Sequence, residues 1–307
     1  MDALEKHMLE EVADLHEIPE GAFNIRYNGK ADGRRSTTNI EIVPKKEEGK
    51  SGIDILIKPG TKNQSVHIPV VLSLSGLKET VYNDFYVGED SDVTIVAGCG
   101  ISNCGAGDSQ HDGIHTFHIG KNAKVRYIEK HYGEGTGTGD RILNPVTIIE
   151  IEEGGSMEMD SVQIKGVTST KRETRAVLGP DTTLEVKEKI MTHGTQYAST
   201  DFTVDMNGDG SSANIISRSV AKENSRQYFR SRINGNCRCS GHSECDSIIM
   251  DHGSVTAEPQ LTANDLDASL IHEAAIGKIA GDQLIKLMTL GLTEAEAEEQ
   301  IVNGFLK

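Results

Sequence analysis

Four short segments of this chain share one pattern: an apolar residue, a polar turn of five residues that contains glycine, and a second apolar residue. The pattern occurs as VGEDSDV (87–93), IGKNAKV (119–125), IEEGGSM (151–157) and LGPDTTL (178–184). The start points of these copies are therefore almost evenly spaced along the chain. Self-similarity at such a period is typical of arrays in which each unit buries its apolar face only by stacking on the next.

The segments between these turns have the pattern of short strands. From about residue 52 they are alternating or fully apolar, as in HIPVVLSLSG, DVTIVAG and PVTIIEIEEG, and most are bounded by glycine or proline. No helical periodicity separates them. The pattern therefore predicts an all-β core, either the turns of a parallel β-helix or sheet stacked on sheet, with a β-sandwich as the alternative. Polar stretches before residue 52, NGKADGRRSTT and PKKEEGKSG, are interpreted as connectors.

Helical patterns are confined to the two ends of the chain. Leu4, Met8 and Val12 recur every four residues within 3–16, which predicts a short helix that Pro19 closes. Near the other end, apolar positions at 284, 287 and 288 predict a helix that stops at Gly291.

A second C-terminal helix follows at once. TEAE (293–296) has the form of a capping box, and Ala297, Ile301 and Phe305 share one face behind it. Such a hairpin either covers the end of the β stack or docks a partner, and the residues alone leave both readings open.

Composition excludes several classes of function. The chain carries 31 Lys+Arg against 47 Asp+Glu, a net charge of -16, which argues against nucleic acid or an anionic membrane as partner. GKS (49–51) lacks the earlier glycine of a phosphate-binding loop, because that position holds Pro44. No run of 18 apolar residues and no signal-peptide pattern is present, so we expect a cytoplasmic protein. In that reducing compartment, an odd count of five cysteines favours metal-binding or catalytic thiols over disulfides.

Three of the cysteines lie close together in the sequence. Cys237 and Cys239 are two apart, so on a strand their thiols would point the same way, and Cys245 begins an apolar run. Thiolates suit iron–sulfur clusters, zinc or copper(I), and they are the nucleophiles of persulfide chemistry. The C-x-C-x5-C spacing lacks the paired C-x2-C of a closed zinc site, so spacing leaves a functional and a packing role equally open.

Two weaker candidates lie upstream. HDGIHTFH (111–118) reads as turn and strand, which puts His118 opposite His111 and His115 and favours a surface or packing role over a metal site. Cys99 and Cys104 lie in the glycine-rich AGCGISNCGAG and form a weak alternative site.

The C-terminal part of the chain, from Cys245 onward, carries a more specific combination. A Cys-Asp-Ser triplet (245–247) follows a β run, a His-Glu-Ala segment (272–274) comes next, and DQL…GLTE…A…IVNGF closes the chain. In this order the pieces resemble the C-terminal part of the SufB/SufD family, scaffold subunits of the SUF iron–sulfur cluster assembly machinery. The resemblance implies a right-handed parallel β-helix followed by a helical domain, here divided as an N-terminal helix (1–20), a β-helix core (21–268) and a C-terminal helical subdomain (269–307). The chain is similar to the compact SufB-like members.

Site residues follow from the resemblance one position at a time. Cys245 lies where SufB-type members have their cluster-assembly cysteine, and Glu273 lies where they have its partnering glutamate. His272 belongs to the same triplet, whereas Ile271 replaces an acidic residue that is frequent there. Cys237 and Cys239 match no landmark of the family and are candidates for additional ligands or for a sulfur relay, as is His272.

The expected function is therefore a non-enzymatic scaffold for a transient iron–sulfur cluster. Cys and Glu from each chain of a homodimer would hold the cluster, and a carboxylate makes such a site labile because it binds cluster iron less well than a thiolate does. The expected partners are a SufC-type ATPase on the C-terminal helices, a sulfur donor and acceptor apoproteins. One alternative is a SufD-like accessory subunit that binds no cluster. A β-helix enzyme acting on polysaccharides is disfavoured, because aromatic residues make up only 4% of the chain and export signals are missing.

Overall fold

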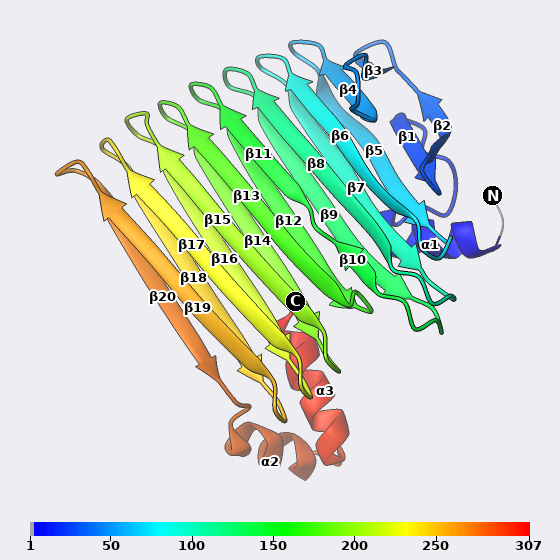
Figure 1. Ribbon diagram of the computed structural model, residues 1–307. Coiled ribbons are helices and arrows are strands. Elements are labelled where there is room, and N and C mark those ends of the chain that lie inside the picture. The colour runs from blue at the N-terminus through cyan, green and yellow to red at the C-terminus, as the bar shows by residue number, and fades with distance from the viewer. Residues whose placement is uncertain (1–2) are drawn as a thin grey trace.

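The computed structural model describes residues 3–307, most of which form two long parallel sheets that face each other (Figure 1). From β5 onward the chain alternates between the sheets, so each turn of the coil adds one strand to each. The first sheet runs, in spatial order, β2 (Lys30–Arg35), β1 (Ala22–Tyr27), β5 (Lys62–Leu72), β7 (Asp92–Ser102), β9 (Lys124–Glu134), β12 (Ser156–Lys165), β14 (Thr183–Thr192), β16 (Ser212–Ala221), β18 (Ser240–Ile249), β20 (Ser269–Gly277).

The second sheet is built in the same way. Its order is β19 (Ser254–Ala263), β17 (Arg226–Gly235), β15 (Tyr197–Met206), β13 (Ser169–Leu178), β10 (Arg141–Leu143) with β11 (Val146–Ile151), β8 (Ser109–Ile119), β6 (Lys78–Val87), β4 (Gly52–Ile57), β3 (Ile40–Pro44). The predicted parallel β-helix, with one helix before it and two after it, is confirmed.

The repeated glycine turns are the corners of this coil. Each of the four connects a strand of the second sheet to the next strand of the first, as Val87 at the end of β6 is followed by β7. Corners of successive turns stack by backbone hydrogen bonds, because Gly120 N donates to Val87 O at 2.9 Å and Gly179 N donates to Ile151 O at 3.0 Å. A Cβ at Gly88 would collide with the backbone of Pro59 one corner below. The period seen in the sequence is therefore the length of one turn.

The core lies between the two sheets. Along most strands buried residues alternate with partly exposed ones, since every second side chain points inward. The rings of Phe85 and Phe117 stack from one turn to the next, 4.4 Å apart. Tyr127 packs against Phe117 from the facing sheet at 4.9 Å, with its ring tilted. The histidine run follows the same rule: His111 and His115 are buried and His118 is exposed, which confirms the predicted strand and packing role.

A helix covers the first sheet near each end of the chain (Figure 1). The N-terminal α1 (Ala3–Ala13) packs Met8 and Val12 over β7, where a Cβ at Gly98 would collide with the Val12 carbonyl. At the C-terminus, α2 (Gly281–Thr289) is followed by α3 (Glu294–Phe305), and α3 packs Val302 against Val220 of β16. The capping box on Thr293 is confirmed, because its hydroxyl accepts from Glu296 N and the Glu296 carboxylate accepts from Thr293 N.

Several boundaries differ from the sequence-based prediction. The stretch NGKADGRRSTT, interpreted as a connector, contains β2, which pairs antiparallel with β1 at the start of the coil. β3 lies between the two predicted connectors, shares only Pro44 with the second, and pairs antiparallel with β4. Residues 269–277 form the last strand and not the start of the helical subdomain, because Leu270 and His272 alternate inward as strand residues. The buried residues of α3 are Ala297, as predicted, and Val302, which takes the place of the predicted Ile301 one position earlier.

The cap of α3 gives a direct test of this helical end. Replacing Thr293 by alanine is expected to lower the stability of α3 by about 1 kcal/mol, because the amide of Glu296 loses its acceptor. Hydrogen exchange of the α3 amides measures this loss. Thr289→Ala is the matched control, since the Thr289 hydroxyl bonds only the Lys286 carbonyl at the end of α2. Equal exchange in the two variants would contradict the assignment of the cap.

Candidate functional site

Cys245 lies inside the coil, one turn from its C-terminal end. It is the sixth residue of β18, is 1% exposed, and has Ser217 and Ala274 as its neighbours on the flanking strands. Its Sγ atom lies 3.9 Å from the Ser247 hydroxyl. Burial raises the pKa of the thiol to about 11, so in the closed coil it is protonated at neutral pH. A metal or a sulfur atom can bind it only as the proton leaves.

Glu273 lies on the opposite side of the same sheet. On β20 it is the neighbour of Glu244, and its side chain is 69% exposed. Because neighbouring strand residues alternate between faces, Glu244 and Glu273 point outward while Cys245 points inward. The two predicted cluster ligands are thus on adjacent strands but on opposite faces of the sheet.

His272 lies on the inner face of the first sheet, the same face as the Cys245 thiol. Its neighbour on β18 is the fully buried Ser243, two residues before Cys245 along the inner face. The Nδ1 atom of His272 is buried and has no hydrogen-bond partner among residues 3–307. The consecutive residues His272 and Glu273 of the C-terminal motif therefore point to opposite faces of the sheet. The His272 imidazole is on the inner face with the Cys245 thiol, and the Glu273 carboxylate is on the outer face.

Cys237 and Cys239 lie in the corner between β17 and β18, and not on a strand as the sequence had indicated. Both side chains still turn toward the core and are buried, and the Cys237 thiol donates to the Met206 carbonyl at 3.3 Å. Burial and the neighbouring Cys237 raise the pKa of the Cys239 thiol. Cys239 is six residues before Cys245, which at about 3.3 Å per residue is about 20 Å. This distance excludes both from a cluster bound to Cys245 in the closed coil.

Cys99 and Cys104 also lie apart from Cys245. Cys104 is exposed in the loop after β7, whereas Cys99 is half-buried on β7 beside His111. Burial alone would lower the pKa of His111, but the Cys99 thiol and the Glu79 carboxylate, 2.9 Å from the ring, raise it to about 10. Five inter-strand steps of about 4.8 Å separate β7 from β18, or about 24 Å.

A row of buried charges lies in the same interior and was not predicted from the sequence. Arg172 contacts Glu129, and its Nε lies 3.5 Å from Glu188, with all three side chains at most 3% exposed. Burial opposes ionisation of both carboxyls. The neighbouring charges of Arg172 and His131 nevertheless hold the pKa of Glu129 well below its usual value. For Glu188 burial dominates and raises the pKa. The sequence did carry a signal for this row, because Glu129, Arg172 and Glu188 occupy positions that the strand alternation predicts to point inward.

This charged row reaches the neighbourhood of the Cys245 thiol. Glu188 accepts hydrogen bonds from Thr200 and from Ser217, each at 2.8 Å, and Ser217 is the strand neighbour of Cys245. The negative charge of Glu188 is one of the contributions that raise the thiol pKa, after burial. Cys245 is thus at the end of a polar interior row and not in a purely apolar core.

Comparison with known proteins identifies the family of this chain. Residues 82–305 match the family model described as "SUF system FeS cluster assembly, SufBD core domain". The chain belongs to the SufBD family. The matched SufBD core spans all the candidate ligands from Cys99 to Glu273 and excludes α1 and the antiparallel start of the coil.

Three curated members of the SufBD family illustrate the relationship, each with a name that reads iron–sulfur cluster assembly SufBD family protein. The protein of Methanocaldococcus jannaschii is 30% identical over 87% of this chain and 84% of its own length. That of Archaeoglobus fulgidus is 31% identical over 85% of this chain and 69% of its own length. That of Pyrococcus horikoshii is 28% identical over 90% of this chain and 84% of its own length. Among residues 3–307, no helix has the length and apolar character needed to cross a bilayer.

Proposed function

We propose that this chain acts in iron–sulfur cluster assembly as a scaffold on which a nascent cluster is held, and not as an enzyme. The observation that carries the proposal is the Cys245 thiol, enclosed one turn from the C-terminal end of a SufBD coil. Family membership and three relatives named for iron–sulfur cluster assembly support the role. The cluster is the cargo, with Cys245 and Glu273 as its proposed ligands.

Opening of the last turn would bring these ligands together. β20 is the edge strand of its sheet, and from Glu273 to its end all of its residues are exposed, unlike those of β18. Such an edge is the part of a stacked coil that separates at least cost in free energy. Once β20 moves away from β18, Cys245 becomes accessible, and the Glu273 side chain can turn toward it from the separated strand.

A second copy of the chain is the proposed partner at this end. β19 and β20 terminate the two sheets, and each has a strand edge that no described residue pairs. Exposed apolar side chains lie there too: Leu261 is 37% exposed and Ile271 is 54% exposed. Unpaired strand edges with apolar side chains favour association. A homodimer formed here would place two sets of Cys245 and Glu273 near one interface.

The proposed ATPase partner would dock on α2. No residue of α2 is buried, although Ile285 and Met288 are apolar and 61% and 42% exposed, and Leu290 after it is 76% exposed. α3 anchors this hairpin to the ends of β14, β16 and β18. A SufC-type ATPase bound to α2 would thus be linked to the strands beside Cys245, so that ATP-driven movement could open the last turn. A sulfur donor and acceptor apoproteins complete the proposed partners.

Docking on α2 is testable by substitution. Ile285→Glu is expected to abolish or strongly weaken co-purification with a SufC-type ATPase, because it places a charge in the centre of the apolar face. Ile18→Glu is the matched control, since Ile18 is 56% exposed near the other end of the coil. Co-purification of both variants at the wild-type level would contradict docking on α2.

The alternative, a SufD-like accessory subunit, differs in its requirement for a third protein. Anaerobic co-purification of the chain with the ATPase alone, followed by reconstitution with iron and sulfide, separates the two readings. A binary complex that gains the visible absorption of a cluster supports the scaffold. A chain that needs a separate cysteine-bearing subunit before any cluster forms supports the accessory role.

A further inference from the structure

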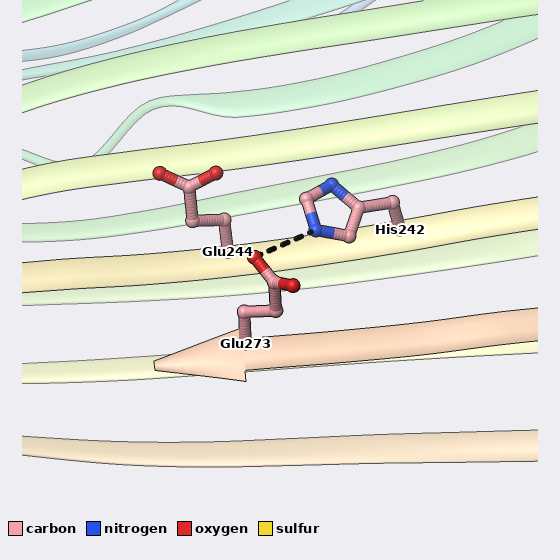
Figure 2. Close-up of side chains that lie close together, drawn as sticks. All are labelled: His242, Glu244 and Glu273. Atoms are coloured by element: carbon pink, nitrogen blue, oxygen red, sulfur yellow. Dashed lines mark ion pairs between the residues drawn. The ribbon is translucent and has the colours of Figure 1, made fainter. Parts of the chain in front are cut away.

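His242, Glu244 and Glu273 form a second potential ligand set, on the outer face of the first sheet (Figure 2). His242 and Glu244 project from β18, and Glu273 projects from β20 directly beside Glu244. One ligand atom from each lies within 4.8 Å of the other two, and His242 Nε2 is 3.8 Å from a Glu273 carboxylate oxygen. The strands thus bring one imidazole and two carboxylates to a common point.

The imidazole is held in the orientation that a metal ligand requires. His242 Nδ1 donates to the Asn214 Oδ1 atom at 2.9 Å, from the neighbouring strand β16. This bond puts the proton on Nδ1 and leaves the Nε2 lone pair directed at the two carboxylates. Metal-binding histidines are held in the same way, with the second nitrogen bonded to a carbonyl or carboxylate.

The surrounding charge favours a cation. Asp246 follows Glu244 on the same face of β18, and Arg218 of β16 lies opposite Asp246. Three carboxylates therefore face one guanidinium, and the side chain of Glu273 has no closer positive partner among the described residues than the His242 ring. Imidazole with carboxylate suits Fe(II), Zn(II) and Mn(II) better than it suits soft monovalent ions, and three protein ligands leave positions open.

We propose that His242, Glu244 and Glu273 bind one divalent first-row transition-metal ion. Two ligand atoms that share such an ion at about 2.2 Å lie at most about 4.4 Å apart, so the exposed Glu273 side chain has only a small distance to close. The site needs neither a thiol nor a cluster, and it lies across the sheet from Cys245. It therefore stands independently of the proposed scaffold role, although both use Glu273.

Anaerobic titration of the metal-free chain with Co(II) tests the site. The wild type is expected to bind one equivalent with weak visible ligand-field bands and without the strong near-ultraviolet band of a cobalt thiolate. His242→Ala and Glu244→Gln are each expected to weaken this binding at least tenfold, and Asn214→Ala by about 10–100-fold. Because these side chains are on the surface of strands, the variants should keep the wild-type circular dichroism and melting temperature.

Two controls make the outcome decisive. His118→Ala removes another outward histidine, paired with Glu150 at 2.8 Å on the second sheet, and should leave Co(II) binding unchanged. Cys245→Ser should also leave it unchanged. Wild-type affinity in His242→Ala, or loss of the cobalt bands in Cys245→Ser, overturns the proposal. Failure of the scaffold role would appear instead in cluster reconstitution on Cys245→Ser, so the two failures are separable.

Discussion

Cys245→Ser is expected to abolish the iron–sulfur cluster that anaerobic reconstitution builds on the wild-type chain. The substitution replaces a soft thiolate ligand by a hydroxyl of similar size, so the packing between β16 and β20 is kept while the affinity for cluster iron is lost. No other thiol in the described part of the chain lies close enough to replace it, because Cys239 in the corner before β18 is about 20 Å away and Cys99 on β7 is about 24 Å across the sheet. Visible absorption and iron counting per chain measure the loss.

Cys104→Ser is the matched control for this prediction. Cys104 is exposed in the loop after β7, so its replacement tests whether a cluster is held by any accessible cysteine. The control should retain the full cluster. A full cluster on Cys245→Ser, with or without loss on Cys104→Ser, would show that Cys245 is not a cluster ligand.

Glu273→Gln is expected to give a cluster of altered stability. A cluster indistinguishable from that of the wild type would assign Glu273 to the outer metal site alone.

Arg172→Met is expected to lower the free energy of unfolding by about 3–5 kcal/mol. Arg172 is 2% exposed between Glu129 and Glu188, and its removal leaves a buried carboxylate without its counter-charge. Methionine fills most of the volume, so the loss reports charge and not a cavity. Urea denaturation followed by circular dichroism measures the change.

Arg175→Met is the control for Arg172. Arg175 pairs with Glu173 on the outer face of the same strand, where its side chain is 66% exposed, so its loss should cost less than about 1 kcal/mol. Adding Glu129→Gln to Arg172→Met should recover part of the stability, because the uncompensated charge is then absent. Equal destabilisation by the two arginine substitutions would contradict the role of the buried pair.

Local patterns in the sequence predicted the architecture of the coil. The glycine turns at 87–93 and 119–125 define its corners, and alternation within HDGIHTFH correctly separated His118 from His111 and His115. The Thr293 capping box and Gly291 likewise marked the ends of the C-terminal helices. Each of these is a property of a few consecutive residues, which is why it can be read without the fold. The resemblance of residues 245–305 to SufB/SufD was confirmed by the family match.

The face on which each candidate ligand lies depended on contacts between distant residues. Cys245 and Glu273 are far apart in the sequence, and only the register of β18 against β20 puts Glu273 beside Glu244 and outside the coil. The same register assembles His242, Glu244 and Glu273, which no spacing in the sequence connects. Arg172 and Glu129 meet across the interior from opposite sheets. The sequence by itself therefore determined the repeat, the strand alternation and the family, whereas the tertiary structure decided which side chains share a site, because coiling sets which strand face is inside and which residues become neighbours.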